Sequence, residues 1–414
     1  MNIDNHLAKG RIADILAALR SLNAADKVEN LSDSVKLNAL LTTLQLSVEA
    51  FDKLLAHNSP VLRTIKGHAF EVVFKRLLAS AGVNAIDIGG DQNVDLVVNE
   101  ITLQLKTPYS AGSKGNFVQF KTHKTHGAKS ENESMTYYHT VEEFPDYLLG
   151  LISYEPFQII FISKDELPRH PKSPNHILSP FSINWTEHEG LNNFKRIGLD
   201  NWIFDSTLFF PLDIKNEQLP LTASKLNLTT NIILDTILVQ SNFRIWDMNI
   251  RGFAREAAIH QLFEAHNISF YSPLNIGKQR ADKSDFALKN SAGAFVFFQV
   301  KGASVNYCTF KGENSTISVE TQLTRGRVND HATQSRLYLK SDFDYLIICL
   351  DPPLTKLFNS ELGEKQTLYW RFFCIPTTEL AEHHTFTNRL KSVQTFKMAD
   401  MNKYEIGSDF FEKY

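Results

Sequence analysis

Two spacings of apolar residues alternate along this chain of 414 residues. Between residues 66 and 78 the apolar side chains recur every three or four positions, which predicts a helix with one buried face. Residues 94–98 form a β-branched run, and residues 101–106 alternate with a period of two. The polar pair Asn99-Glu100 between them predicts a tight turn, so we expect a helix followed by a β-hairpin.

The same order of elements returns in the second half of the chain. Residues 250–263 have helical spacing, and a strand is predicted to begin at Asp285. A turn follows at 290–293, and residues 295–301 return as the second strand of another hairpin. The two halves are therefore predicted to contain the same local unit.

Short sequence matches connect the two halves over a longer stretch. They occur in the same order in both halves, and the separation of the partners changes in small steps, as insertions in surface loops would produce. The matched pairs are 65–71 with 250–256, 94–96 with 284–286, 103–106 with 298–301, 125–127 with 324–326, 146–149 with 344–347, and 157–167 with 370–380. We interpret the chain as two copies of one α/β domain. The alternative is a coincidence between two generic α/β stretches.

Prolines separate the two copies, in a stretch without a clean period. They lie at positions 168, 171, 174, 180, 211 and 220. Because proline interrupts regular structure, we place the boundary near residue 220. Leucines between residues 37 and 46 form an apolar stripe typical of a helix. The predicted organisation is a helical segment at 1–60, a first domain at 61–220 and a second domain at 221–414.

Composition limits the class of protein. Hydrophobic residues make up 43% of the chain and charged residues 21%, as is usual for a soluble protein with several cores. The formal net charge of −3 excludes a polycation of the histone kind but leaves room for a local basic patch. Three cysteines without CxxC spacing argue against a disulfide framework or a zinc ribbon. Neither a signal peptide nor an apolar membrane span is evident, so we expect a cytoplasmic protein.

Polar side chains that are able to bind a metal or take part in catalysis occur in each element of the repeated unit. Glu71 shares a helix face with apolar residues, where a carboxylate needs a partner or a metal. Asp95 lies at the start of the hairpin, and Gln104 and Lys106 share one face of its return strand. The corresponding residues of the second half are Glu256, Asp285, Gln299 and Lys301.

Simpler interpretations exist for each of these residues. Glu71 could form an ion pair with Lys75 one helical turn away. The aspartates could be ordinary strand-entry residues, and each Gln-x-Lys could be the polar side of an edge strand. The return of the whole set in the second half favours a shared chemical role.

A helix Glu, a strand-entry Asp and a Gln-x-Lys on the return strand together resemble the PD-(D/E)xK nuclease superfamily. The resemblance is to the variant in which Gln replaces the acidic residue of the last motif, and it covers the core of each half. It implies two tandem nuclease-like domains, each a central mixed β-sheet flanked by helices, most like those of restriction endonucleases. The implied catalytic residues are Glu71, Asp95, Gln104 and Lys106 in the first domain and Glu256, Asp285, Gln299 and Lys301 in the second.

The resemblance also implies hydrolysis of phosphodiester bonds with Mg²⁺, for which Mn²⁺ can substitute. The implied metal ligands are Asp95 and Gln104 in the first domain and Asp285 and Gln299 in the second. The lysine of each Gln-x-Lys would orient the attacking water and offset charge in the transition state. Because Gln replaces Glu, each site has one negative charge fewer, and we expect weak metal binding.

Basic, threonine-rich stretches follow both predicted sites. Lys, Arg and Thr side chains beside a metal site suit contacts with phosphates, and Arg can also read base edges. The simpler alternative is a solvated loop. The candidate DNA-binding residues are Lys121, Lys124, His126, Thr324, Arg325, Arg327 and Arg336.

The motifs of several other chemistries are missing from the sequence, among them the GxxxxGK[ST] loop, GxGxxG, HExxH and GxSxG. We expect a Mg²⁺-dependent endonuclease of double-stranded DNA, of the type II-like restriction kind. It would act as a pseudo-symmetric monomer with one site per strand, although a dimer stays open, and a cognate DNA methyltransferase is implied. The alternatives are a structure-specific nuclease of repair, recombination or transposition, and a catalytically inactive DNA-binding protein.

Overall fold

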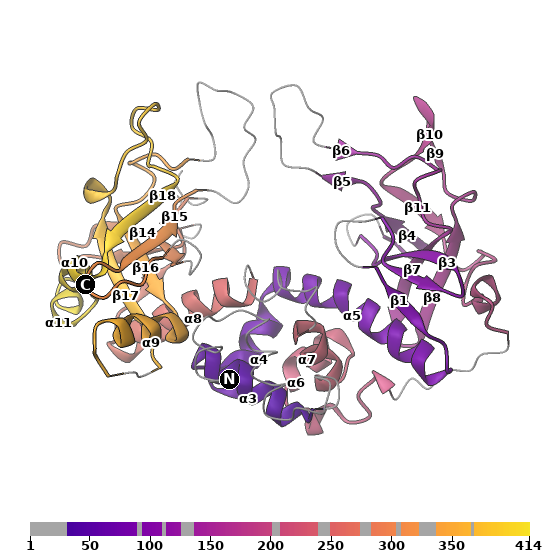
Figure 1. The fold of residues 1–414 in the computed structure, drawn as a ribbon, viewed down its shortest axis with the longest axis horizontal. Helices are drawn as coiled ribbons and strands as arrows, with labels where there is room; N and C mark the ends of the chain where they lie inside the picture. The colour runs from indigo at the N-terminus through magenta and orange to yellow at the C-terminus, as the bar shows by residue number, and fades with distance from the viewer. Residues whose placement is uncertain are drawn as a thin grey trace.

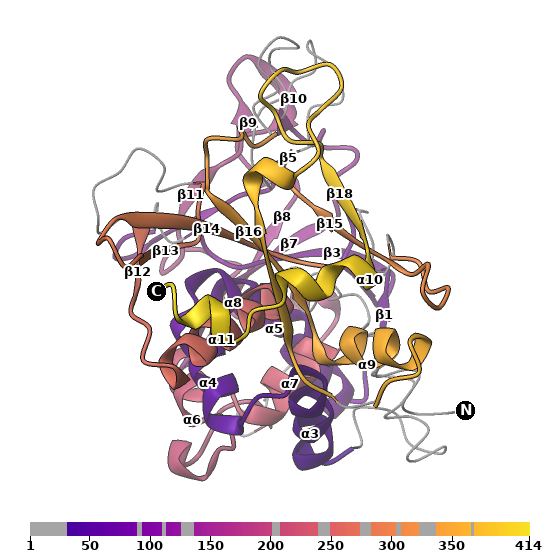
Figure 2. The ribbon, with the colours of Figure 1, turned by 90° about the vertical axis from the view of Figure 1, so that its left-hand side faces the viewer.

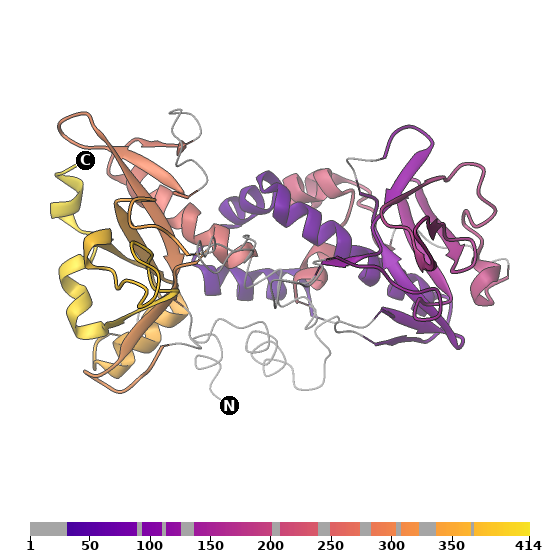
Figure 3. The ribbon, with the colours of Figure 1, turned by 90° about the horizontal axis from the view of Figure 1, so that it is seen from above.

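Helices occupy the middle of the molecule and separate two lobes built on β-sheets (Figure 1). The computed structural model describes residues 31–88, 93–109, 113–125, 136–200, 208–238, 249–273, 283–303, 308–322, 337–365 and 368–414. One lobe comes from each half of the chain, and both lobes stand on the same side of the helices, so that the outline is a broad U. Seen from above, the helices lie between the two lobes (Figure 3).

The first lobe is built on a five-stranded sheet with the order β1-β2-β3-β7-β8. Neighbouring strands are antiparallel except for β3 and β7, which are parallel. Between β2 and β3, Asn99 and Glu100 have φ angles of 49° and 68°, as a two-residue hairpin turn requires. The strands are β1 (Ala85–Asp87), β2 (Leu96–Val98), β3 (Ile101–Lys106), β7 (Tyr147–Tyr154) and β8 (Phe157–Ser163).

The second lobe is built on a five-stranded sheet with the order β12-β13-β14-β16-β17. Its strands are β12 (Phe270–Tyr271), β13 (Phe286–Lys289), β14 (Phe295–Gly302), β16 (Tyr345–Leu350) and β17 (Arg371–Pro376). Again the third and fourth strands of the order are parallel and the other neighbours antiparallel. Both sheets are therefore mixed, and the predicted mixed α/β class is confirmed.

The sheets also agree in register at the predicted site. On the parallel pair of the first sheet, Gln104 lies opposite Leu148. On the parallel pair of the second sheet, Gln299 lies opposite Leu346. These residues belong to segments that the sequence comparison of the two halves had paired, so the register follows the sequence matches.

The central group of helices, here called the helical hub, combines segments from both halves. It consists of α3 (Asp33–Leu44), α4 (Val48–His57), α5 (Ser59–Ser80), α6 (Pro220–Leu226), α7 (Thr230–Leu238) and α8 (Arg251–Ala265). α6 and α7 follow the proposed domain boundary, yet they pack against α3, α4 and α5. From the hub, α5 extends to the first lobe and α8 to the second (Figure 1).

A buried cluster of charges joins three helices of the hub. Lys36 of α3 is completely buried, and its ammonium lies 2.6 Å from an Asp235 carboxylate oxygen on α7. Arg76 of α5 pairs with the same carboxylate. Burial raises the pKa of Asp235, and the two cations counteract that rise. Since an unpaired buried charge is unfavourable, the cluster links the positions of α3, α5 and α7.

The helix predicted at 66–78 is the central part of α5, which begins earlier because Asn58 caps it. The Asn58 side chain accepts a hydrogen bond from the Val61 N–H. The apolar face of α5 packs on β3, where Leu103 and Phe70 belong to the same core. This packing places the helix beside the return strand of the hairpin.

Smaller elements complete the lobes. β4 (Phe117–Phe120) pairs with β11 (Phe181–Asn184), and β15 (Thr316–Glu320) pairs with β18 (Val393–Lys397). Figure 2 shows the second lobe from its outer side, with α9 (Pro352–Glu361), α10 (Met398–Met401) and α11 (Ser408–Phe411). The remaining short elements are β5 (Lys124–Thr125), β6 (Thr136–Tyr137), β9 (Arg169–His170), β10 (Ser173–Ile177), η3 (Phe194–Ile197), η5 (Ile214–Asn216), η9 (Thr377–Glu379) and η10 (Asn402–Tyr404). Within the described ranges, the helices are too short or too polar to cross a membrane.

Candidate functional site

Asp95 is positioned by the backbone of the hairpin that it opens. Its N–H donates to the Leu103 carbonyl at 2.9 Å, and its Oδ2 accepts a hydrogen bond from the Leu105 N–H at 2.7 Å. Among the described residues, no donor contacts the other oxygen, Oδ1. The hairpin thus fixes the carboxylate and leaves one oxygen for a ligand.

Asp285 is held in the same way in the second lobe. Its N–H donates to the Phe298 carbonyl at 2.8 Å, and its Oδ2 accepts a hydrogen bond from the Val300 N–H at 2.7 Å. The Gln299 side-chain amide donates to the same oxygen, also at 2.7 Å. In both lobes the aspartate is therefore anchored to the residue that precedes the lysine of the Gln-x-Lys.

The two glutamines are almost completely buried, with exposed fractions of 3% for Gln104 and 4% for Gln299. Gln104 Nε2 donates to the Asn93 carbonyl at 3.1 Å, whereas its Oε1 has no donor within the described ranges. A buried amide oxygen without a donor is unfavourable unless a water or a cation satisfies it. Gln104 Oε1 and Asp95 Oδ1 are hard oxygen atoms of the kind that Mg²⁺ prefers.

The predicted metal ligands carry few negative charges. In the part of the chain that the structure describes, no three His, Cys, Asp or Glu side chains gather into a metal-binding group. Each predicted site brings a strand aspartate, a helix glutamate and a neutral glutamine. Weak metal binding at these sites stays a prediction.

The helix carboxylates are half-buried, not fully buried as the helical spacing alone predicted. Glu71 is 28% exposed, and its Oε1 lies 3.7 Å from His68 Nδ1 on the same helix. Its expected alternative partner, Lys75, pairs with Asp87 of β1. On α8, His260 stacks on Phe270 with ring centroids 3.9 Å apart. The simple one-turn ion pair on α5 was therefore the wrong interpretation of Glu71.

Charged groups from several elements act on Asp95 at the first site. Burial raises the pKa of Asp95, while the Lys106 ammonium and the Leu105 N–H counteract the rise. The carboxylates of Glu71 and Asp87 raise the pKa further. α5, the hairpin and β1 thus bring their charges close enough to act on one another.

Charged groups also act on one another at the second site. Asp285 is an exposed residue by surface area, but its Oδ2 is hydrogen-bonded to Val300 and Gln299, and desolvation of the carboxylate raises its pKa. Burial likewise raises the pKa of Glu256 to about 7, with the Asp285 charge adding to the rise. Burial lowers the pKa of Lys301, and the two carboxylates oppose that change. The structure therefore brings the predicted Glu, Asp, Gln and Lys of the second half together.

Sequence reasoning missed two features of these sites. Asp146 Oδ2 accepts a hydrogen bond from the Thr102 N–H at 3.0 Å, and Asp344 Oδ2 accepts one from the Phe297 N–H at 2.8 Å. These aspartates tie the return strand to its parallel neighbour in each lobe. Their segments were matched between the halves, and that match was the available signal. The other missed feature is Arg255, which lies beside Glu256 and acts on its charge.

The predicted DNA-binding residues lie mostly outside the described part of the chain. His126, Thr324, Arg325, Arg327 and Arg336 are outside the described residues, and for Lys124 the structure describes the backbone in β5. Lys121 is exposed, and its ammonium lies 3.5 Å from the centroid of the Tyr109 ring. Tyr109 follows Lys106 by three residues, so this cation–π pair lies next to the first site along the chain.

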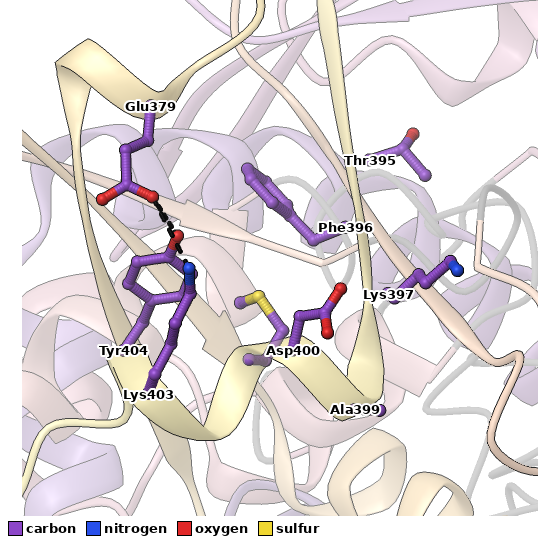
Figure 4. A pocket seen from close by; sticks show the side chains of 9 residues that line it. Glu379, Thr395, Phe396, Lys397, Ala399, Asp400, Lys403 and Tyr404 are labelled. Carbon is purple, nitrogen blue, oxygen red and sulfur yellow. Dashed lines mark hydrogen bonds and ion pairs between the residues drawn. The ribbon is translucent and has the colours of Figure 1, made fainter.

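A pocket of about 620 Å³ opens elsewhere in the second lobe, between η9, β18, α10 and η10 (Figure 4). At one side, the Tyr404 hydroxyl donates to Glu379, and the Lys403 ammonium lies 3.8 Å from the same carboxylate. None of the eight predicted catalytic residues lines this pocket. It is therefore separate from the sites described above.

No family model, curated protein or solved structure gives a significant match to this chain. The matched geometry of the two lobes is therefore the basis on which a function can be inferred.

Proposed function

We propose that this chain is a metal-dependent DNA endonuclease with two PD-(D/E)xK-like domains that arose by duplication. The observation that carries the proposal is the matched anchoring of the two aspartates. In each lobe, Oδ2 accepts a 2.7 Å hydrogen bond from the backbone of the residue before the lysine. The same hairpin therefore anchors an aspartate in the same way twice, each time on a strand that carries a Gln-x-Lys.

The sheets support duplication independently of the side chains. Strand order, strand directions and the register at Gln104 and Gln299 are the same in both lobes. The parallel neighbour in matching register favours duplication over a coincidence between two generic α/β stretches.

In this proposal the residues have different chemical roles. Asp95 with Gln104, and Asp285 with Gln299, would hold a Mg²⁺ ion, which when bound polarises a phosphoryl oxygen and acidifies a water. The lysines provide positive charge where the phosphate gains negative charge in the transition state.

The arrangement of the lobes suits a duplex substrate. The two sheets stand opposite each other on one side of the helical hub (Figure 1). One site in each lobe would act on one strand, so a single chain would make a double-strand break. We propose a restriction-type activity on this basis, which implies a cognate DNA methyltransferase that protects the host.

Plasmid cleavage tests the proposal. Supercoiled plasmid of diverse sequence is incubated with Mg²⁺ or EDTA and with wild type, Lys106→Ala, Lys301→Ala or the double variant. We expect discrete linear fragments from wild type, nicked circles from each single variant and no cleavage from the double variant. Lys53→Ala is the control, because Lys53 is an exposed lysine on α4, 2.7 Å from Glu49.

Each other outcome points to a different function. Cleavage at junctions or ends without sequence preference would replace the restriction assignment with a repair, recombination or transposition nuclease. Binding of DNA without any Mg²⁺-dependent cleavage, on methylated and unmethylated plasmid alike, would contradict the nuclease proposal and favour a catalytically inactive DNA-binding protein.

A further inference from the structure

The second site has an arginine where the first has a phenylalanine. Arg255 precedes Glu256 on α8, and the match between the halves places Phe70 at the corresponding position of α5. Phe70 is fully buried and lies beside Phe74, with ring centroids 6.2 Å apart. The same helix position thus supplies a core side chain in the first lobe and a guanidinium in the second.

The guanidinium of Arg255 lies against the strand that bears Lys301. A β-carbon placed on Gly302 would be only 1.9 Å from Arg255 Cζ, so the guanidinium fills the space that a side chain at this position would need. The first half has Thr107 at the corresponding position. Gly302 therefore admits Arg255 at the end of β14, next to Lys301 along the strand.

Arg255 acts on the charges of the second site. Its positive charge counteracts the rise in the pKa of Glu256 and contributes to the lowered pKa of Lys301. Both effects have the sign expected of a cation close to the two groups. The second site therefore holds a permanent positive charge in addition to its lysine.

The first site has no cation at the position of Arg255. Besides Lys106, the charges that act on Asp95 are the carboxylates of Glu71 and Asp87, and Lys75 pairs with Asp87. In the second lobe the Glu320 carboxylate also acts on Lys301, more weakly than Arg255 does. Arg255 is thus the cation that distinguishes the second site from the first.

We propose that Arg255 weakens the binding of the divalent ion at the second site, so that the first site is loaded first and its strand is cut first when the ion is limiting. This inference rests on the proposed function, because it takes Asp95 and Asp285 as metal ligands. One positive charge near a divalent ion in a partly solvated site changes the ion's affinity by about tenfold. A purely structural role beside Gly302 would not make that affinity depend on the charge of residue 255.

Binding of Mn²⁺ measures the two sites separately, without DNA and without turnover. Asp95→Asn leaves the second site, Asp285→Asn leaves the first, and the EPR signal of free Mn²⁺ is followed during titration. We expect the first site to bind Mn²⁺ about tenfold more tightly than the second. Arg255→Met should tighten the second site by about tenfold, while Arg255→Lys, which keeps the charge, should leave it unchanged.

The matched control is Arg255→Met in the Asp285→Asn protein, where the affinity of the first site should not change. Circular dichroism and urea unfolding verify the fold of every variant, and Arg255→Gln replaces Arg255→Met if the latter does not fold. Equal affinities at the two sites, or no effect of charge removal at residue 255, would overturn this inference and leave the nuclease proposal standing. A lack of Mn²⁺ binding in wild type and in both single-site proteins would overturn both.

Discussion

The side-chain amide of Gln299 donates a hydrogen bond of 2.7 Å to the Asp285 carboxylate. This contact explains why a neutral side chain suits a position that the wider family resemblance assigns to an acid. Two carboxylates this close would repel each other in a surrounding of low polarity, whereas an amide N–H stabilises the charged aspartate before any metal binds. The glutamine thus stabilises the Asp285 carboxylate without adding a second negative charge.

Gln299→Glu should therefore make the second lobe dependent on metal for stability. In EDTA at pH 8, we expect the free energy of unfolding to fall by about 2 kcal/mol, because the new carboxylate faces Asp285. Mn²⁺ should restore much of this loss, since the ion neutralises the pair. Thermal unfolding with and without Mn²⁺ measures both effects.

The control for this change is Gln394→Glu in the same lobe. Gln394 is 1% exposed, and its Nε2 donates to the Ala381 carbonyl at 2.8 Å, away from the predicted site. This variant should lose stability without recovery in Mn²⁺. Equal recovery of the two variants would show that the ion acts on the protein in general, and the site at Asp285 would lose its support.

Glu256 gives the metal-free protein a predictable pH dependence. Its pKa is 4.5 as a free side chain and about 7 in the folded chain. Between these values the folded state binds more protons than the unfolded state, so the free energy of unfolding falls as the pH rises through this window. Glu256→Gln removes this loss. The variant should gain stability relative to wild type between pH 4.5 and pH 8, by about 3 kcal/mol at most.

Urea unfolding in EDTA across this pH range measures the difference between the variant and wild type. The matched control is Glu264→Gln, which changes an exposed carboxylate on the same helix. Its difference from wild type measures the effect of removing one exposed carboxylate from α8. If the Glu256→Gln difference did not change between pH 4.5 and pH 8, the Glu256 carboxylate would not be desolvated in the folded chain.

The local elements of the site could be predicted from the sequence because short-range rules determine them. Period-two alternation and a polar pair predicted the hairpin, and the structure has it with Asn99 and Glu100 in the left-handed region. The same alternation placed Gln104 and Lys106 on one strand face. Matches between the halves placed Asp146 and Asp344 in equivalent strands, although not their hydrogen bonds to the return strand.

The hub could not be predicted in this way, because its contacts join residues that are far apart in the chain. Nothing in the spacing around Lys36 indicates that it pairs with Asp235 in the other half. The short distance between Arg255 and Gly302 could not be predicted from the sequence either, since it depends on how α8 packs against β14. Periodicity describes which face of an element is buried but not what covers that face.

Gly150 is the point at which the first sheet is most sensitive to added volume near Lys106. It lies opposite Lys106 on the parallel strand, and a β-carbon there would be 2.4 Å from Phe120 Cζ and 2.9 Å from Ile160 Cγ2. Gly150→Ala should lower the free energy of unfolding by about 1–3 kcal/mol because it overpacks the core.

Addition of Phe120→Leu to Gly150→Ala should recover part of that loss, since it removes the ring that the new methyl group meets. Gly252→Ala is the contrasting change. Apart from its chain neighbours and the backbone of its own helix, no atom of the described residues lies within 4 Å of a β-carbon there, and the residue is helical. It should be neutral or stabilise the protein by up to about 1 kcal/mol. Urea unfolding measures all three variants, and a Gly150→Ala protein as stable as wild type would show that the sheet adjusts freely.

The charge cluster of the hub predicts an unequal response to the loss of its members. Asp235→Asn removes the carboxylate that lies 2.6 Å from the buried Lys36 ammonium, whereas Lys36→Met leaves Asp235 with Arg76, which is 29% exposed. The first change should therefore cost about 3–5 kcal/mol and the second clearly less. Urea unfolding of the two single variants and of the double variant measures the difference.

Because α3, α5 and α7 come from both halves, Asp235→Asn should also loosen α5 beside the first site, which hydrogen exchange of its backbone amides would detect. Equal costs for the two single variants would mean that Arg76 does not stabilise the carboxylate, and the cluster would then be a simple pair of Lys36 and Asp235.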